Sequence, residues 1–265
     1  MKSIIKSKDN ANIKLYSKLL TSKKTRNEHN MFTLEGARII IDAVNENSEL
    51  YCVFLTESAA EKYSEALDLL NEKIPERSIF YISDELSQKL SDTSTPQGIY
   101  AIVKKLDKNN YADKILTDGK YIVLNNLQDP GNIGTIIRSA DAVGINGIFL
   151  TNDCCDIYNP KLIRSTMGSL FRMNIWADIS IEEFFVLAKE KKIKTFAAVI
   201  DADAISLTDS DFTGACAVVI GNEGNGLPQD VTNKCDKKLT IKMQGNINSL
   251  NAAMATGIIM WEMLK

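Results

Sequence analysis

Three short polar stretches of this 265-residue sequence could carry chemistry, and the first of them opens a helical segment. The apolar run YIVLNNL is followed by Asp129, Pro130, Gly131 and Asn132. Proline and glycine favour a turn there, and Asn132 lies where its side chain could cap the first N–H groups of the helix. Arg138 follows nearly two turns later, and its side chain could project toward the same N-terminal end of the helix. The alternative is a plainly capped helix with a surface arginine.

The second polar stretch is rich in glycine. The buried-strand pattern ACAVVI is followed by Gly221, Asn222, Glu223 and Gly224, and then by Gly226. Glycine tolerates positive φ and lets a ligand approach the main chain closely. The spacing differs from the dinucleotide-binding fingerprint, so the glycines alone are a weak signal. Glu223 is the sharper signal, because a carboxylate at the carboxyl end of a sheet strand lies where open α/β folds bind ligands.

The third polar stretch joins the last predicted strand to the last predicted helix. It contains Ile241, Met243, Ser249, Leu250 and Asn251. Ser249 has the residue type of an N-cap, and capping is its whole role in the simplest interpretation. Asn251, just inside the predicted helix, would then point its polar atoms toward the N-terminal end of that helix. All three stretches follow predicted strands, at the edge where open parallel sheets bind ligands.

The elements that must position these stretches alternate between strand and helix. In the second half, short runs rich in β-branched residues are each followed by a turn and usually by a helical stretch: YIVLNNL, GIFLTN, TFAAVID, AVVIGN and KLTIKM. This pattern predicts an α/β domain over residues 119–265, with a mostly parallel sheet covered on both faces. A similar alternation predicts a smaller α/β domain over residues 1–104. The polar, aperiodic stretch 105–118 is the expected linker.

Charge is distributed unevenly along the chain. The net charge of −3 and the pI of 5.4 argue weakly against a nucleic-acid partner. Residues 1–38, however, hold nine basic and three acidic residues, whereas residues 39–100 hold four basic and twelve acidic ones. The apolar spacing over 10–24 predicts a basic amphipathic helix. Its basic side is either a solvated face or an RNA-binding surface, and such a surface would use Lys14, Lys18, Lys23, Lys24, Arg26 and Arg38.

Composition disfavours several other classes of protein. No signal-peptide pattern follows the first residues, and no segment reaches the roughly 18 apolar residues of a membrane span, so we expect a cytoplasmic protein without a membrane partner. The five cysteines form no CxxC pair and His29 is the only histidine, so neither a metal site nor a disulfide framework is expected. The last segment, SLNAAMATGIIMWEMLK, is apolar around most of its predicted helix, and we therefore expect a homodimer.

In order and spacing, the three polar stretches resemble a known family. The motifs of the SpoU/TrmH family of RNA 2′-O-ribose methyltransferases, in the SPOUT superfamily, resemble DPGNIGTIIRSADAVG, VVIGNEGNGLP and IKMQGNINSLNAAMA. The substrate-binding domain fused to many rRNA-modifying members resembles NANIKLYSKLL, KKTRNEHNMFTLEGARIIIDA and TSTPQGIYAIV. The resemblance covers nearly the whole chain. It implies S-adenosylmethionine-dependent methylation of a ribose 2′-hydroxyl in RNA, with 23S rRNA as the expected substrate.

The resemblance also implies roles for individual residues. It implies a polar active site made of Asn132, Arg138, Glu223, Ser249 and Asn251. It implies that S-adenosylmethionine binds largely to the main chain of the last two motif loops, here Ile220, Gly221, Asn222, Gly224, Gly226, Ile241, Met243 and Leu250. In the family Arg138 would contact or deprotonate the hydroxyl. Because the pKa of arginine exceeds about 12, positioning an RNA phosphate is the physically easier role. Glu223 would either hold Arg138 in place or orient Asn132.

The resemblance further implies a trefoil knot in the C-terminal domain, with the cofactor bent inside the knotted pocket. General folding principles alone predict an unknotted Rossmann-like sheet. Two alternatives to an rRNA methyltransferase stay open: a tRNA 2′-O-methyltransferase of the same family and a catalytically silent RNA-binding or ribosome-assembly relative. The intact polar set disfavours the silent relative. A nucleotide-dependent oxidoreductase is disfavoured because G-x-G-x-x-G does not follow the first strand of the second half.

Overall fold

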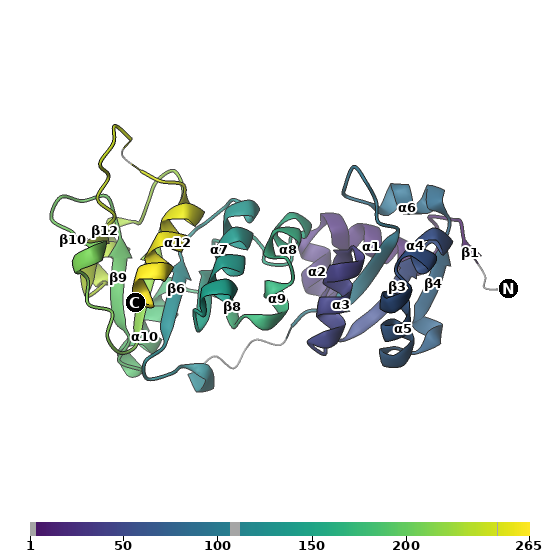
Figure 1. The fold of residues 1–265 in the computed structure, drawn as a ribbon, viewed down its shortest axis with the longest axis horizontal. Helices are drawn as coiled ribbons and strands as arrows, with labels where there is room; N and C mark the ends of the chain where they lie inside the picture. The colour runs from purple at the N-terminus through teal and green to yellow at the C-terminus, as the bar shows by residue number, and fades with distance from the viewer. Residues whose placement is uncertain (1–3, 107–111, 248) are drawn as a thin grey trace. The chain divides into compact units, whose positions relative to one another are not determined.

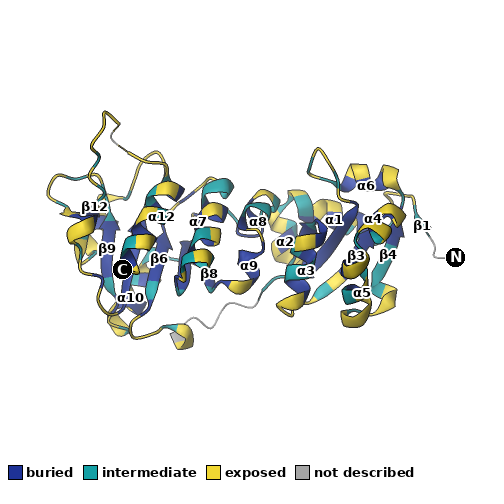
Figure 2. Cartoon of the chain, in the orientation of Figure 1, coloured by how far each residue is buried: buried dark blue, intermediate teal, exposed yellow. Residues whose placement is uncertain are grey.

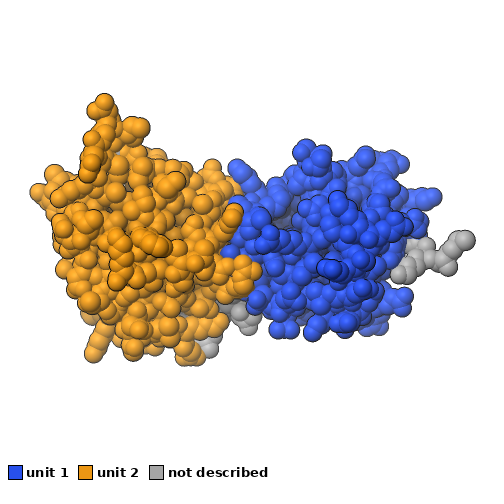
Figure 3. Space-filling model, in the orientation of Figure 1, with its two compact units in different colours: residues 1–107, 158–171 blue, residues 108–157, 172–265 orange. Residues whose placement is uncertain are grey.

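The computed structural model describes residues 4–106, 112–247 and 249–265. The chain divides into two compact units, each with its own β-sheet (Figures 1 and 3). Unit 1 comprises Met1–Asp107 and Tyr158–Phe171, and unit 2 comprises Lys108–Ile157 and Arg172–Lys265. Residues 107–111 of the predicted linker lie outside the described residues.

Unit 1 contains a five-stranded mixed sheet in the order β1-β4-β3-β5-β2. β1, β4 and β3 are parallel, whereas β5 is antiparallel to both of its neighbours. The strands are β1 (Ile4–Ile5), β2 (Met31–Glu35), β3 (Leu50–Leu55), β4 (Ile79–Ile82) and β5 (Ile99–Lys104). The helices are α1 (Ala11–Thr21), α2 (Lys23–His29), α3 (Ala37–Asn45), α4 (Glu57–Lys62), α5 (Ser64–Lys73), α6 (Asp84–Leu90), α8 (Pro160–Thr166) and α9 (Ser169–Arg172), with a short 3₁₀ turn η1 (Glu76–Ser78).

The basic stretch predicted as one helix over residues 10–24 forms two helices. Ser22 has an extended conformation (φ −122°, ψ 111°) that ends α1, and its hydroxyl accepts a hydrogen bond from the N–H of Thr25 at 3.1 Å, which caps α2. Serine is favoured at such caps and disfavoured inside helices, because its hydroxyl competes for main-chain hydrogen bonds. The helical region after β3 is likewise divided, at Tyr63, into α4 and α5.

Helices α8 and α9 lie in unit 1 although they come from the middle of the second predicted domain. Phe32 of β2 is fully buried, and its ring lies 4.6 Å from that of Tyr158 and 6.5 Å from that of Phe171, measured between centroids. The hydroxyl of Tyr158 also accepts a hydrogen bond from the N–H of Leu106 at 3.0 Å. The segment 158–171 is therefore part of the core that covers β2.

Unit 2 contains a seven-stranded sheet in the order β10-β12-β9-β11-β6-β7-β8, and all neighbouring strands are parallel. The strands are β6 (Lys120–Leu124), β7 (Gly147–Thr151), β8 (Ile175–Ile179), β9 (Lys194–Ala198), β10 (Ile205–Ser206), β11 (Cys216–Ile220) and β12 (Lys237–Thr240). The helices are α7 (Pro130–Val143), α10 (Ile181–Glu190), α11 (Gln229–Lys234) and α12 (Ala252–Met263), with 3₁₀ turns η2 (Ala112–Lys114) and η3 (Leu207–Asp209). The predicted α/β class is confirmed; β8 and β10 were not predicted, and the knot stays a prediction.

The central strands of unit 2, β9, β11, β6 and β7, are buried on both faces. Every residue of β7 and β11 is buried. Figure 2 shows β9 and β6, the neighbours of β11 on either side, largely in the colour of buried residues. Phe184 of α10 packs against one face, with its ring centroid 5.2 Å from that of Phe149. Helix α7 turns Ile133, Ile136 and Ile137 into the core, and α12 packs against α7. The starts of α7 and α12 are thereby held where the first and third polar stretches can meet.

Candidate active site

The three polar stretches follow β6, β11 and β12, at the carboxyl edge of the parallel sheet of unit 2. β6 and β11 are neighbours, with Leu124 opposite Ile220 at their ends. Just beyond these ends, the side-chain amide of Asn222 donates a hydrogen bond to the main-chain oxygen of Asn126 at 2.8 Å. The loops after the two strands are therefore tied to each other.

Glu223 is the centre of a polar network at this edge. Its Oε1 accepts hydrogen bonds from the N–H of Asp129 and from Nδ2 of Asn132, both at 3.1 Å, and its Oε2 accepts one from the N–H of Gln128 at 3.3 Å. Partial burial disfavours ionisation, but the hydrogen bonds outweigh it and hold the pKa of Glu223 below its ordinary value. Glu223 is therefore ionised at neutral pH and orients Asn132.

Asn251 connects the third stretch to the same network. Its Nδ2 donates a hydrogen bond to Oδ1 of Asn132 at 3.0 Å. Its Oδ1 accepts from the N–H groups of Ala253 and Met254, at 2.9 and 3.3 Å, and so caps α12. The amide of Asn132 is thus held at its nitrogen by Glu223 and at its oxygen by Asn251.

Two predicted helix caps are wrong. Asp129, rather than Asn132, caps α7, because its Oδ1 accepts from the N–H groups of Gly131 and Asn132 at 2.6 and 3.2 Å. Asn251, rather than Ser249, caps α12. Aspartate, asparagine and serine are about equally good caps, so residue type could not decide between positions two or three residues apart. The side chain of Asn132 is consequently used in the network, and that of Ser249 lies exposed beside the pocket described below.

Arg138 lies farther along α7, outside the network. Its side chain is exposed, and no hydrogen bond or ion pair links it to Glu223 or Asn132 within the part of the chain that the structure describes. On a helix with 3.6 residues per turn, Asn132 and Arg138 point in different directions. Of the two roles expected for Glu223, the structure shows the orientation of Asn132 and not a contact with Arg138.

Glycine is required where the second stretch turns back on itself. Asn222 and Gly226 form an antiparallel bridge, with N–H to oxygen distances of 3.1 and 2.9 Å. A Cβ on Gly221 would lie 2.3 Å from the main-chain carbon of Gly226, so a larger residue would force this hairpin open. Gly226 has a φ of 67°, which residues with a side chain rarely adopt. The hairpin therefore presents mainly main-chain groups to its surroundings.

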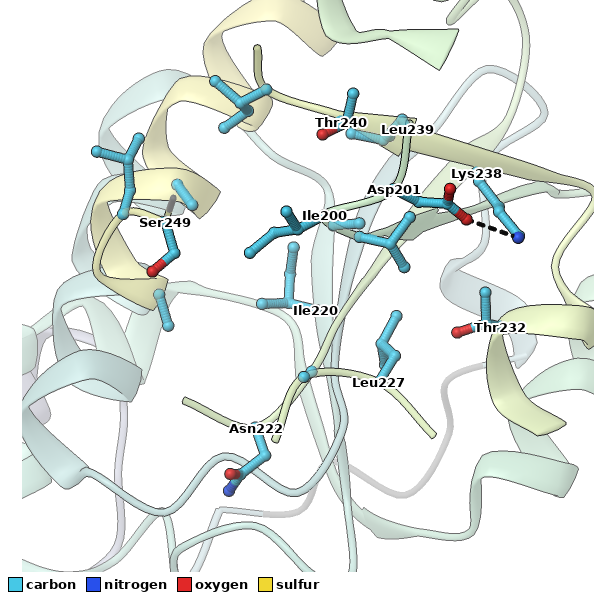
Figure 4. A pocket seen from close by; sticks show the side chains of 18 of the residues that line it. Ile200, Asp201, Ile220, Asn222, Leu227, Thr232, Lys238, Leu239, Thr240 and Ser249 are labelled. Atoms are coloured by element: carbon cyan, nitrogen blue, oxygen red, sulfur yellow. Dashed lines mark hydrogen bonds and ion pairs between the residues drawn. The ribbon is translucent and has the colours of Figure 1, made fainter. Parts of the chain in front are cut away.

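A pocket of about 520 Å³ lies beside this hairpin (Figure 4), a volume within the range of cofactor sites. It is lined by every residue that was predicted to bind the cofactor: Ile220, Gly221, Asn222, Gly224, Gly226, Ile241, Met243 and Leu250. Glu223 and Ser249 line it as well. A further wall was not predicted from the sequence: residues 198–201, at the end of β9 and directly after it. Their place after a predicted parallel strand was the signal that could have found them.

The predicted RNA-binding residues lie in unit 1, and all but one are exposed: Lys14, Lys18, Lys23, Lys24 and Arg38. Arg26 was wrongly included. Only 4% of Arg26 is exposed, and its Nη1 donates a hydrogen bond to the main-chain oxygen of Leu19 at 2.6 Å, near the end of α1. A guanidinium buried against helix carbonyl groups stabilises the helix end and is not presented to RNA.

Within residues 4–106, 112–247 and 249–265, no group of three or more His, Cys, Asp or Glu side chains could hold a metal ion. No helix there is long and apolar enough to cross a membrane. None of the five cysteines, which all lie within these ranges, forms a disulfide.

A parallel sheet that carries a glycine hairpin, an oriented amide and a cofactor-sized pocket at its carboxyl edge is the arrangement of a cofactor-binding α/β enzyme. The chain belongs to the SpoU rRNA methylase family, which residues 119–261 match. Residues 10–101 match the MRM3-like substrate binding domain. The family expected from the three motifs is therefore confirmed.

Similar proteins match nearly the whole chain. The 23S rRNA (guanosine(2553)-2′-O)-methyltransferase RlmP of Bacillus subtilis (strain 168) is 26% identical over 98% of this chain and 98% of its own. The 23S rRNA (uridine(2479)-2′-O)-methyltransferase of Streptomyces viridochromogenes is 29% identical over 97% of this chain and 90% of its own. The AdoMet-bound rRNA methyltransferase from Sinorhizobium meliloti has a crystal structure that matches with a TM-score of 0.87 and 25% identity, covering 98% of this chain and 97% of that one.

The lowered pKa of Glu223 predicts a pH-dependent contribution to stability. Because folding lowers this pKa from its ordinary 4.5, the ionised carboxylate stabilises the fold fully above that value, and the stabilisation is lost as pH falls through the lower pKa of the folded protein. Urea unfolding at several pH values should therefore show Glu223→Gln less stable than the wild type at pH 7, with a difference that shrinks in acid. Glu182→Gln, on the exposed face of α10, is the control. Its free energy of unfolding should differ little from that of the wild type at any of these pH values, because it loses only a weak surface ion pair with Lys234. A Glu223 difference that grew in acid would contradict the network.

Proposed function

We propose that this protein transfers a methyl group from S-adenosylmethionine to a ribose 2′-hydroxyl of 23S rRNA. The observation that carries the proposal is the amide of Asn132, held at both ends by Glu223 and Asn251 beside the pocket. The RNA class is supported by the two relatives named as 23S rRNA methyltransferases, which match this chain over at least 90% of their length. The match of residues 10–101 to a substrate-binding domain supports it further.

The pocket fits S-adenosylmethionine in size and lining. Ile220, Leu227 and Leu239 offer apolar surface to an adenine ring, and the hairpin offers main-chain donors and acceptors without side chains in the way. Ile241 and Leu250 would contribute main-chain groups from the opposite loop. When bound, the cofactor supplies a methyl group activated by a sulfonium. The chain itself must bind that cofactor, exclude water and align the ribose oxygen.

The side chains of the network suit orientation better than proton removal. Glu223 already accepts three hydrogen bonds, which stabilise its ionised form and lower its basicity. Asn132 uses one of its two amide hydrogens for Glu223 and keeps the other, with a lone pair on Oδ1, for a ribose hydroxyl. Ser249 is exposed on the pocket wall and would complete the polar surface. Arg138 would hold the adjacent phosphate, because guanidinium groups match phosphate oxygens in pairs.

The protein is proposed to act as a homodimer. One side of α12 and its flanks exposes a continuous apolar row: Leu250, Met254, Ile258, Trp261 and Leu264. Met254 and Trp261 are 60% and 61% exposed, unusually high for large apolar side chains on one helix face. Burial of such a row against a second copy would remove it from water, and a two-fold axis would bring the same row from both chains together.

RNA binding is proposed for the basic face of unit 1. Lys18, Lys23 and Lys24 are exposed on α1 and α2, and they follow one another closely enough to track a phosphate backbone. Lys14 and Lys24 approach Asp9 and Glu28 at 2.8 and 3.8 Å, but these exposed pairs are weak and leave the lysines able to exchange partners. We propose that the RNA bound by this face is ribosomal RNA and that the protein acts in the cytoplasm.

Arg138 provides the most direct test of the chemistry. Arg138→Ala should fold and bind cofactor normally, because the side chain is exposed, yet lose methyl transfer by on the order of 100-fold or more. Arg138→Lys should also be impaired, because lysine keeps the charge and loses the planar fork. The measurement is single-turnover transfer of labelled methyl to 23S rRNA, with tRNA as the competing substrate. Wild-type rates in the alanine variant would remove Arg138 from the mechanism, and faster transfer to tRNA would overturn the rRNA assignment.

The basic face can be tested by charge reversal. Replacing four lysines with glutamate should weaken rRNA binding and reduce its salt dependence, because fewer counterions are released: Lys14, Lys18, Lys23 and Lys24. A matched variant reverses four exposed lysines elsewhere in unit 1 and should bind nearly as the wild type does: Lys62, Lys73, Lys89 and Lys104. Filter binding over a range of salt concentrations gives both slopes. Equal slopes for the two variants would show that the first set is only a solvated face.

The proposed dimer predicts a change of mass. Light scattering should report twice the chain mass of 29.4 kDa for the wild type. Met254→Glu combined with Trp261→Glu should give the single-chain mass, because burying two carboxylates in an apolar interface is costly. Val186→Glu is the control, since Val186 is 69% exposed on α10, away from the row. A wild type that stays monomeric at micromolar concentration would rule out the dimer.

A further inference from the structure

One wall of the cofactor pocket carries an ion pair that the proposed chemistry does not use. Asp201 follows β9 and Lys238 lies in β12, the strand next to it in the sheet. Oδ2 of Asp201 accepts a hydrogen bond from Nζ of Lys238 at 2.8 Å, and the two side chains are 32% and 35% exposed. Figure 4 shows the pair on the side of the pocket away from Ser249.

Asp201 has acceptor capacity to spare. The charged residues among those that line the pocket are Asp201, Glu223 and Lys238. Glu223 is committed to the loop before α7 through its three hydrogen bonds. Oδ1 of Asp201 accepts one hydrogen bond, from the N–H of Asp203 at 3.0 Å, and Oδ2 accepts one from Lys238. Each carboxylate oxygen can accept two, so Asp201 can take two further donors.

The position of Asp201 indicates which part of the cofactor supplies those donors. β9 lies beside β11, so the loop that carries Asp201 is next to the glycine hairpin. In open α/β folds, a carboxylate near a glycine-rich loop at this edge of the sheet characteristically accepts hydrogen bonds from ribose hydroxyls. A vicinal diol offers two neutral donors on adjacent carbons, which one carboxylate can accept without giving up Lys238. An ammonium group would instead compete with Lys238 for the same oxygens.

We propose that Asp201 binds the vicinal diol of the cofactor ribose, and that Lys238 is a positioning residue that holds the carboxylate toward the pocket. The proposal rests on the proposed function, since it requires that the pocket binds S-adenosylmethionine. It makes Asp201 a determinant of cofactor specificity on the side of the pocket away from Ser249. The pair also keeps Asp201 ionised, because the pKa of Asp201 is lowered mainly by its hydrogen bond with Lys238.

Calorimetry with three ligands tests the proposal: S-adenosylhomocysteine, its analogue without ribose hydroxyls, and methylthioadenosine, which keeps the ribose and lacks the amino-acid end. Asp201→Ala should weaken S-adenosylhomocysteine about ten- to a hundredfold, the range for a hydrogen bond to a charged group. It should weaken methylthioadenosine by the same factor and leave the analogue without hydroxyls unchanged. Asp201→Asn, which keeps the shape, repeats the test if the alanine variant is unstable.

Controls separate this role from a structural one. Asp203→Ala removes a neighbouring exposed carboxylate from the same loop and should bind all three ligands as the wild type does. Lys238→Gln should bind S-adenosylhomocysteine severalfold more weakly and discriminate less against the analogue without hydroxyls. If Asp201→Ala weakened the binding of all three ligands equally, the ion pair of Asp201 and Lys238 would serve only to stabilise the loop. If Asp201→Ala weakens S-adenosylhomocysteine but not methylthioadenosine, Asp201 binds the amino-acid end of the cofactor. Either of these two results would overturn the proposal. Failure of the wild type to bind S-adenosylhomocysteine would instead overturn the proposed function.

Discussion

The structure of the active edge depends on one carboxylate shared between loops that leave different strands. Glu223 comes from the hairpin after β11, yet its hydrogen-bond donors belong to the loop after β6 and to the first turn of α7. Asn132 in turn accepts a hydrogen bond from Asn251, which lies at the start of α12. Three segments distant in sequence are therefore held by a chain of polar contacts only a few atoms long. A shorter residue in place of Glu223 would leave two main-chain N–H groups without this partner, and the amide of Asn132 would be held only at its oxygen, by Asn251.

At this edge, main-chain groups and side chains have different roles. The hairpin between Asn222 and Gly226 closes only because Gly221 has no Cβ, and this keeps side chains away from the pocket wall on that side. Recognition there falls to main-chain groups, whose positions are set by the sheet and vary little. Orientation of a reacting hydroxyl needs adjustable donors and acceptors, and these come from the amides of Asn132 and Asn251. The division explains why the pocket combines three glycines with so few charged groups.

The sequence predicted the sheet edge well and the local details poorly. Runs such as YIVLNNL and ACAVVI are short, apolar and bounded by turns, so the strands and the loops after them were evident. IWADI, which forms β8, has only intermediate burial at Ala177 and exposes Asp178, and its apolar signal was too weak to stand out. The caps at Asp129 and Asn251 could not be told from Asn132 and Ser249, because the residue types have equal capping propensity and only tertiary contacts distinguish positions two or three residues apart. Arg26 was misassigned because charge is visible in a sequence and burial is not.

The inclusion of residues 158–171 in unit 1 bears on how the protein is made. A ribosome delivers the chain from its N-terminus at about 5–20 residues per second, and domains usually fold as they emerge. The buried ring of Phe32 is synthesised early, but its neighbours Tyr158 and Phe171 follow only after β6, α7 and β7. Unit 1 can consequently be completed only after residues 108–157 of unit 2 have been made. A nascent chain stopped before Tyr158 leaves Phe32 without its aromatic neighbours, and a chaperone could recognise this unfinished apolar surface.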